Sequence, residues 1–181
     1  MTMKKISITL LLGMMFLGSL FAQELKRPTQ AVFVEVGGAG LVYSFNYDTR
    51  FDKERIDSWG LRAGFGAYAL SDESFLSIPV QLTKIFGKQK HFFEIGAGAT
   101  LVNYKDTYFD YYSGGSSEES DKYYQFILDM GETPSVMGTL NFGYRRIPEE
   151  EGFTWRVNLT PLFNGDGFWP LFAGVGFGYA F

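Results

Sequence analysis

The sequence predicts an all-β fold, an eight-stranded antiparallel up-and-down β-barrel that spans a membrane and is preceded by a cleavable signal peptide. Eight runs alternate between apolar and polar or small residues, as strands with two different faces do. The composition agrees, because 19 Phe, 11 Tyr and 22 Gly suit strands, aromatic girdles and close packing. The alternative, a soluble β-sandwich, does not explain a secretion signal and an aromatic C-terminus together.

The N-terminal segment has the pattern of a secretory signal peptide. Lys4 and Lys5 form a basic region, Ile6–Phe21 is apolar, and Ala22 offers a small residue for cleavage. We therefore expect residues 1–22 to be removed and residues 23–30 to form a short periplasmic segment. An N-terminal membrane anchor is the alternative, but the apolar stretch is short for a spanning helix. The absence of cysteine excludes a lipoprotein anchor, disulfides and thiolate metal sites.

Residues 31–181 are expected to form the barrel, and the sequence divides them into eight alternating runs. The predicted strands are Ala31–Gly37, Leu41–Phe51, Trp59–Leu70, Phe75–Phe86, Phe92–Tyr104, Val136–Ile147, Phe153–Leu162 and Leu171–Phe181. Short turns connect most of them, and one long segment, Lys105–Ser135, separates the fifth from the sixth. The first run is the least regular, because it is short for a spanning strand.

Membrane barrels of this kind have short periplasmic turns, longer external loops and periplasmic termini. With Phe181 in the periplasm, the turns Asp52–Ser58, Gly87–His91 and Pro148–Gly152 are periplasmic, and Lys105–Ser135 is external. The number of strands must then be even, so Ala31–Phe51 must hold two strands with a turn at Gly38–Gly40. Aromatic side chains are expected to form the girdle at the periplasmic interface. They are Tyr47, Trp59, Phe86, Phe93, Tyr144, Trp155, Tyr179 and Phe181.

The last ten residues, Phe172–Phe181, carry a second pattern. Odd positions are apolar and mostly aromatic, and even positions are Gly or Ala, so one face suits lipid and the other a crowded interior. Gly176, Tyr179 and Phe181 resemble the glycine and two aromatics of the C-terminal sorting signal of outer-membrane barrels. Gly174 departs from that signal, which has a larger polar residue there.

The chain as a whole resembles the small eight-stranded outer-membrane proteins, the OmpX-like, OmpW-like and OmpA-barrel families. The resemblance rests on Gly-aromatic strands such as Gly60–Tyr68 and Phe93–Leu101, the motif Asn141–Arg145 and the terminal strand. It implies a monomer in the outer membrane of a Gram-negative bacterium, surrounded by lipid and inserted by the barrel-assembly machinery. It does not imply one function, because these families include adhesion, small-solute and structural members.

Alternation also predicts which side chains face the interior. The polar members of that face are Glu35, Ser44, Asn46, Asp48, Arg62, Gln81, Thr83, Glu94, Thr100, Thr139, Asn141, Arg145, Thr154, Arg156, Asn158 and Thr160. Charges inside a narrow barrel are costly unless they are paired. We therefore expect a charge network in which Glu35, Asp48 and Glu94 pair with Arg62, Arg145 and Arg156. A closed, polar-filled interior follows, with a gated pathway as the alternative.

Catalytic and cofactor signals are weak. His91 is the only histidine, and its predicted place is a periplasmic turn, so we expect no catalytic residues. No cofactor or metal site is expected, since the acidic residues lack the spacing of a calcium loop. After removal of the signal peptide, the chain has 14 basic and 20 acidic residues. The net charge of −6 argues against nucleic acid as a partner.

The external segment 105–135 is the most distinctive candidate for function. It holds seven acidic residues against two lysines, a net charge of −5, and it is rich in tyrosine. The predicted contact residues are Tyr108, Asp110, Tyr111, Tyr112, Tyr123 and Tyr124. A hairpin that contacts an external protein or glycan is one interpretation, and a solvated loop is the other. The sequence thus favours a structural or surface-interaction protein, with a narrow channel or conduit for small hydrophobic ligands as the alternative and a lipid-modifying enzyme third.

Overall fold

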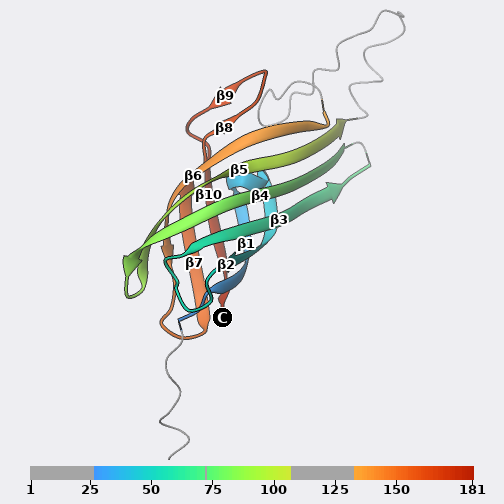
Figure 1. The fold of residues 1–181 in the computed structure, drawn as a ribbon. Helices are drawn as coiled ribbons and strands as arrows, with labels where there is room; N and C mark the ends of the chain where they lie inside the picture. Colours follow the sequence, from blue (N-terminus) through green and yellow to red (C-terminus); the bar gives the residue numbers. More distant parts are fainter. Residues whose placement is uncertain (1–26, 72, 107–132) are drawn as a thin grey trace, which may run out of the picture.

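The computed structural model describes residues 27–71, 73–106 and 133–181, and in this part of the chain eight antiparallel strands close into a barrel (Figure 1). Their bounds are β1 Gln30–Gly37, β2 Tyr43–Arg50, β3 Trp59–Ala69, β4 Glu73–Lys88, β5 His91–Asp106, β6 Ser135–Arg146, β7 Gly152–Leu159 and β10 Ala173–Ala180. The order is β5-β4-β3-β2-β1-β10-β7-β6, and pairing of β5 with β6 closes the circle. The predicted eight-stranded antiparallel β-barrel is confirmed.

The segment from Ala31 to Phe51 holds two strands, as the parity of the barrel requires. β1 pairs with β2 on one side and with β10 on the other, so the first and last strands complete the wall. Gln30 and Phe181 exchange backbone hydrogen bonds of 3.0 and 2.9 Å. The first described residues and the C-terminus therefore lie at the same end of the barrel.

The outer face of the barrel wall is apolar and the inner face is largely polar, the reverse of the distribution in a soluble protein. Phe45 is 61% exposed on the outer face, whereas Arg62 is 0% exposed inside. Large apolar side chains dominate the outer face of every long strand, and acids, arginines and amides fill the interior. Such a distribution suits a lipid solvent, since apolar side chains there need no cover.

Strand lengths make the barrel asymmetric. β4 and β5 have 16 residues each, whereas β1, β2, β7 and β10 have eight. In Figure 1, β3 to β6 extend beyond β1, β2, β7 and β10 at the end opposite to the C-terminus, where the hairpin of β8 (Leu162–Phe163) and β9 (Phe168–Trp169) also projects. About 9–11 residues suffice to cross a bilayer, so β4 and β5, with 16 residues each, are longer than a crossing requires and continue past the barrel end formed by β1, β2 and β10. Residues 107–132, between β5 and β6, lie outside the described ranges, as do the predicted signal peptide and residues 23–26.

The seventh predicted strand, Phe153–Leu162, is interrupted. β7 ends at Leu159, and Pro161, which has no N–H, precedes a second short strand. This strand, β8 (Leu162–Phe163), pairs with β6 and with β9 (Phe168–Trp169), so the connection between the seventh and eighth predicted strands contains half of a small hairpin. Asn164 Oδ1 accepts hydrogen bonds from the backbone N–H groups of Asp166 and Gly167, both 2.9 Å, and fixes its tip.

The interior is layered along the barrel axis. An apolar cluster fills the end near β8, and a second one fills the end near the C-terminus. The first cluster consists of Leu41, Phe75, Val102, Tyr104, Met137 and Leu162. The second consists of Ala31, Phe33, Ile85, Phe92, Ile147 and Ala180. Buried charges and amides lie between the clusters. No helix in the described part of the chain is long and apolar enough to cross a bilayer.

Candidate functional site

The six charged residues that the sequence predicts inside the barrel all lie in its interior. Six different strands supply them: Glu35 from β1, Asp48 from β2, Arg62 from β3, Glu94 from β5, Arg145 from β6 and Arg156 from β7. Each is buried, because each occupies an inward position of its strand. A charge layer built this way ties strands that are far apart in the sequence.

Each acid of the layer has an arginine partner. Glu35 forms an ion pair with Arg62, whose guanidinium is fully buried with it. Arg145 joins two acids, with Nη2 2.8 Å from Asp48 Oδ2 and Nε 2.7 Å from Glu94 Oε2. Arg156 Nη2 lies 2.7 Å from the other oxygen of Glu94, and its Nε lies 3.5 Å from Glu35 Oε1. The pairs therefore form one continuous network across the barrel.

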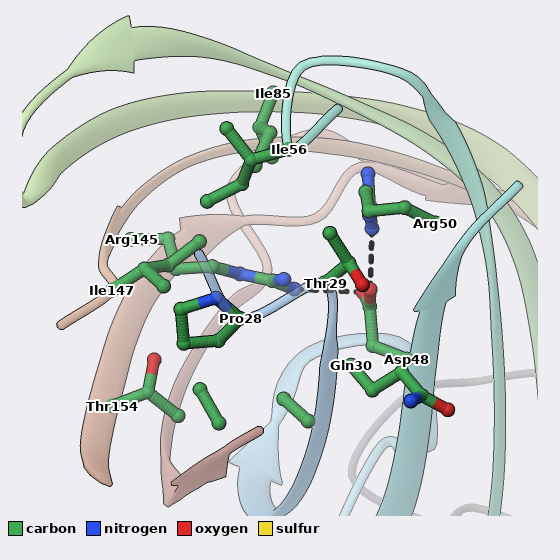
Figure 2. A pocket seen from close by; sticks show the side chains of 12 residues that line it. Pro28, Thr29, Gln30, Asp48, Arg50, Ile56, Ile85, Arg145, Ile147 and Thr154 are labelled. Atoms are coloured by element: carbon green, nitrogen blue, oxygen red, sulfur yellow. Dashed lines mark hydrogen bonds and ion pairs between the residues drawn. The ribbon is translucent and has the colours of Figure 1, made fainter. Parts of the chain in front are cut away.

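Arg50 belongs to the network and was missing from the predicted set. Its guanidinium pairs with Asp48 and donates to Thr83 Oγ1 at 2.7 Å. Figure 2 shows Asp48 linked to both Arg50 and Arg145, with Pro28 and Thr29 nearby. The sequence did carry a signal, because Arg50 is two residues after Asp48 and shares its inward face.

Neutral side chains complete the hydrogen bonding of the layer. Arg62 Nε donates to Asn46 at 3.1 Å, and Arg62 Nη1 donates to Gln81 at 3.2 Å. Gln81 in turn donates to Thr139 at 2.9 Å, and Asn141 donates to Glu94 at 3.0 Å. The amides thus link the ion pairs to the rest of the interior.

Phe33 is the apolar centre of this polar region. Its ring lies 5.0 Å from the guanidinium carbons of Arg62 and Arg156 and 5.8 Å from that of Arg145. Cation–π attraction favours a guanidinium near an aromatic face, and more so away from water. Phe33 is not among the predicted inward residues, which were all polar, although its position between Ala31 and Glu35 gives it the same inward parity.

The connection between β1 and β2 closes one end of the interior. It forms a 3₁₀ turn, η1 (Gly38–Gly40), whose residues are buried. Ser77 Oγ donates to the carbonyl of Gly40 at 2.9 Å, and Thr100 Oγ1 donates to that of Ala39 at 2.7 Å. The turn is therefore held inside the barrel by hydroxyls of β4 and β5.

Leu41 follows this turn in a strained backbone conformation, with φ 70° and ψ −76°. Val42 N–H donates to the carbonyl of Gly40 at 3.0 Å, so Leu41 is the centre of a γ-turn, which non-glycine residues rarely adopt. Its side chain is 2% exposed and packs in the first apolar cluster. We attribute the persistence of the strained turn to this burial.

The opposite end of the interior is closed by the chain before β1 and by apolar side chains. Pro28 and Thr29 are buried there beside Ile56, Ile85 and Ile147, which line a cavity of about 10 Å³. A second cavity of about 10 Å³ lies beside Arg145 and Arg156. Each has room for about one water molecule.

The other predicted residues are distributed as follows. Gly176 faces the interior, where an added Cβ would lie 3.0 Å from Arg156 Cγ, and Tyr179 and Phe181 face outward. Their role in insertion stays a prediction. His91 is exposed, and its Nδ1 lies 2.6 Å from the Tyr144 hydroxyl. The predicted contact residues Tyr108, Asp110, Tyr111, Tyr112, Tyr123 and Tyr124 lie outside the described ranges.

Rows of outward aromatics lie near the end that holds the C-terminus. The strand register aligns Phe86 with Phe93 and Phe93 with Tyr144 across β4, β5 and β6. Lys84 Nζ lies 5.5 Å from the Trp59 ring centroid and 5.7 Å from that of Phe86. Aromatic rings with an adjacent cation are typical of the boundary between hydrocarbon and headgroups.

A solved structure shares this architecture. The N-terminal β-barrel domain of Pseudomonas aeruginosa OprF aligns with a TM-score of 0.52 and 16% identity, over 84% of this chain and 95% of that one. This likeness shows the fold alone, an eight-stranded antiparallel β-barrel. The outer-membrane enzyme PagL aligns with a TM-score of 0.39 and 14% identity, over 83% of this chain and 96% of that one. No family model and no curated protein sequence matches this chain.

Proposed function

We propose that this protein is a closed, monomeric outer-membrane barrel of a Gram-negative bacterium, with both termini in the periplasm, that acts through surface contacts of its external segment 105–135. The observation that carries the proposal is the filling of the barrel. Paired charges occupy its middle, and apolar side chains occupy both ends. Such an interior supports a structural or surface role better than transport.

The unequal strand lengths support a role for the external end. β3 to β6 extend beyond the rest of the barrel at the end opposite to the C-terminus. They would carry segment 105–135 away from the membrane. Tyrosine rings are good contact groups, and the net charge of −5 would keep the segment from associating with itself or with an anionic membrane surface.

An enzymatic role receives less support. The chain has one histidine, His91, and it lies with Tyr144 at the end that we assign to the periplasm. In the described part of the chain, no carboxylate contacts either side chain, so none could orient the imidazole for acid–base chemistry. We propose no catalytic residue.

The test is a deletion of residues 110–123 that leaves β5 and β6 intact. Cells with the intact and the shortened protein would be compared on a glycan array and on immobilised host-surface proteins. A matched variant would keep the acids and replace Tyr108, Tyr111, Tyr112, Tyr123 and Tyr124 with Ser. Both variants should insert normally and lose binding. Unchanged binding by the deletion would refute the contact role.

A conductance measurement separates this proposal from the channel alternative. Purified protein in a planar bilayer should give no discrete current steps, since the interior is filled along its length. Reproducible single-channel steps from the intact protein, absent with a heat-denatured sample, would favour the channel.

A further inference from the structure

The charges buried in the barrel do not balance. Among the described residues, four arginines are buried inside, Arg50, Arg62, Arg145 and Arg156, and three acids, Glu35, Asp48 and Glu94. Arginine keeps its proton in proteins, so the layer has an excess of one positive charge. An uncompensated charge in a low-dielectric interior is costly, even where most of its neighbours are paired.

The excess has a definite place, because Arg156 is the arginine among the described residues whose buried donors lack a hydrogen-bond acceptor; the other buried side-chain atom without a hydrogen-bond partner is Glu94 Oε2. Arg156 Nη2 donates to Glu94 Oε1 at 2.7 Å and to Asn141 Oδ1 at 3.3 Å. Its Nη1 and Nε are buried and lack a hydrogen-bond acceptor in the described part of the chain. The 3.5 Å distance from Nε to Glu35 is an ion-pair distance without hydrogen-bond geometry. Glu94 is already shared with Arg145.

A small cavity lies beside this side chain. Its volume is about 10 Å³, and Arg156, Arg145 and Thr154 contribute its polar lining. Ala31, Phe33, Trp155 and Gly176 complete the wall. The volume suits one small species and excludes a carboxylate ligand or a phosphate. The Thr154 hydroxyl already donates to the carbonyl of Arg146 at 2.7 Å, so guanidinium groups dominate the polar lining.

We propose that this cavity holds a single halide-sized monovalent anion, chloride under cellular conditions, bound by Arg156 with Arg145 as its neighbour. A water molecule would satisfy the free N–H donors but would leave the excess charge in place. An anion would accept hydrogen bonds from the donors and also neutralise the excess charge. It would be bound as the barrel closes and would stabilise the folded state by mass action.

The test compares refolding in two anions at equal ionic strength. Protein unfolded in urea would be refolded into non-ionic detergent micelles in sodium chloride or in sodium gluconate, whose anion is too large for the cavity. Equal ionic strength keeps screening the same. Chloride should raise the urea midpoint saturably, and bromide should replace it. At ten times the dissociation constant, the ratio of folded to unfolded protein should rise about elevenfold. Equal midpoints in chloride and gluconate would overturn the proposal.

Two further measurements locate the effect. Arg156→Gln should remove the difference between chloride and gluconate, whereas Arg55→Gln, in an exposed turn, should retain it. A chloride effect of full size in Arg156→Gln would refute the site. If Arg156→Gln fails to fold, crystals of the intact protein grown in bromide give the answer. An anomalous peak beside the Arg156 guanidinium is expected, and its absence at full bromide concentration would contradict the proposal.

Discussion

The charge layer and the apolar cluster around Leu41 both fill the same barrel, but they respond differently to change. In the charge layer, each partner holds another buried charge in place, so one substitution exposes an unpaired group to a dry environment. In the apolar cluster, a shortened side chain costs the lost contact area and the cavity left behind. The comparison shows that the charge layer tolerates few substitutions. In the apolar cluster, the loss of stability should instead scale with the volume that is removed.

The largest effect should follow from Arg145→Met. Arg145 is the partner of both Asp48 and Glu94, so its loss leaves two buried carboxylates with weaker compensation. We expect the free energy of unfolding in detergent micelles to fall by about 3–5 kcal/mol. Urea titration of refolded protein would measure it. Adding Glu94→Gln should recover part of the loss. A loss below about 1 kcal/mol would show that the layer is not a network.

The apolar cluster should respond less, and in proportion to the volume removed. Leu41→Ala deletes a 2% exposed side chain, and we expect a loss of about 2–4 kcal/mol in the free energy of unfolding. Leu171→Ala is the matched control, because Leu171 is 82% exposed and should change stability little. A cost at Leu41 no larger than at Leu171 would mean that the β1–β2 turn is not held by burial.

Phe33 belongs to an apolar cluster and also lies against the guanidiniums of the charge layer, and its substitution should cost less than either of the two changes above. Phe33→Leu keeps an apolar side chain but removes the ring that faces three guanidiniums. The expected cost is about 1–2 kcal/mol, from the lost cation–π attraction and imperfect filling. Ile85→Val is the comparison, because Ile85 lies in the same apolar cluster and has no aromatic ring for a guanidinium to contact. Equal costs for the two changes would assign Phe33 a packing role alone.

The sequence predicted much of this arrangement for a physical reason. Alternation with period two assigns each residue of a strand to one face, so the inward acids and arginines from Glu35 to Arg156 could be predicted without coordinates. The pairing of these residues was harder to predict, because the choice of acid for each arginine depends on the strand register and on side-chain length across the barrel. Arg145 bridging Asp48 and Glu94 is such a case.

The irregular segments were not predictable in the same way. The inward fold of Gly38–Leu41 depends on hydroxyls from β4 and β5, which no local pattern reveals. The break at Pro161 could have been predicted, since proline lacks the N–H that a strand interior uses, but the short hairpin after it depends on pairing with β6.

The smallest effect concerns an ion pair outside the barrel. Arg55 and Asp57 lie 3.2 Å apart in the turn between β2 and β3, and their side chains are 66% and 53% exposed. The hydrogen bond from Arg55 lowers the pKa of the Asp57 carboxyl below its ordinary value. A carboxyl with a lowered pKa in the folded state adds stability above its unfolded pKa, and this contribution is lost as the pH falls through the folded pKa.

Because water screens this pair, Arg55→Gln should change the unfolding midpoint at pH 7 very little, in contrast to Arg145→Met. It should still raise the pKa of Asp57 toward its ordinary value, which carboxyl NMR shifts would measure between pH 2 and 6. An unchanged Asp57 titration in the variant would show that the pair does not form in solution. A stability loss as large as that of Arg145→Met would mean that burial does not explain why ion pairs of the charge layer contribute more to stability than a solvated pair.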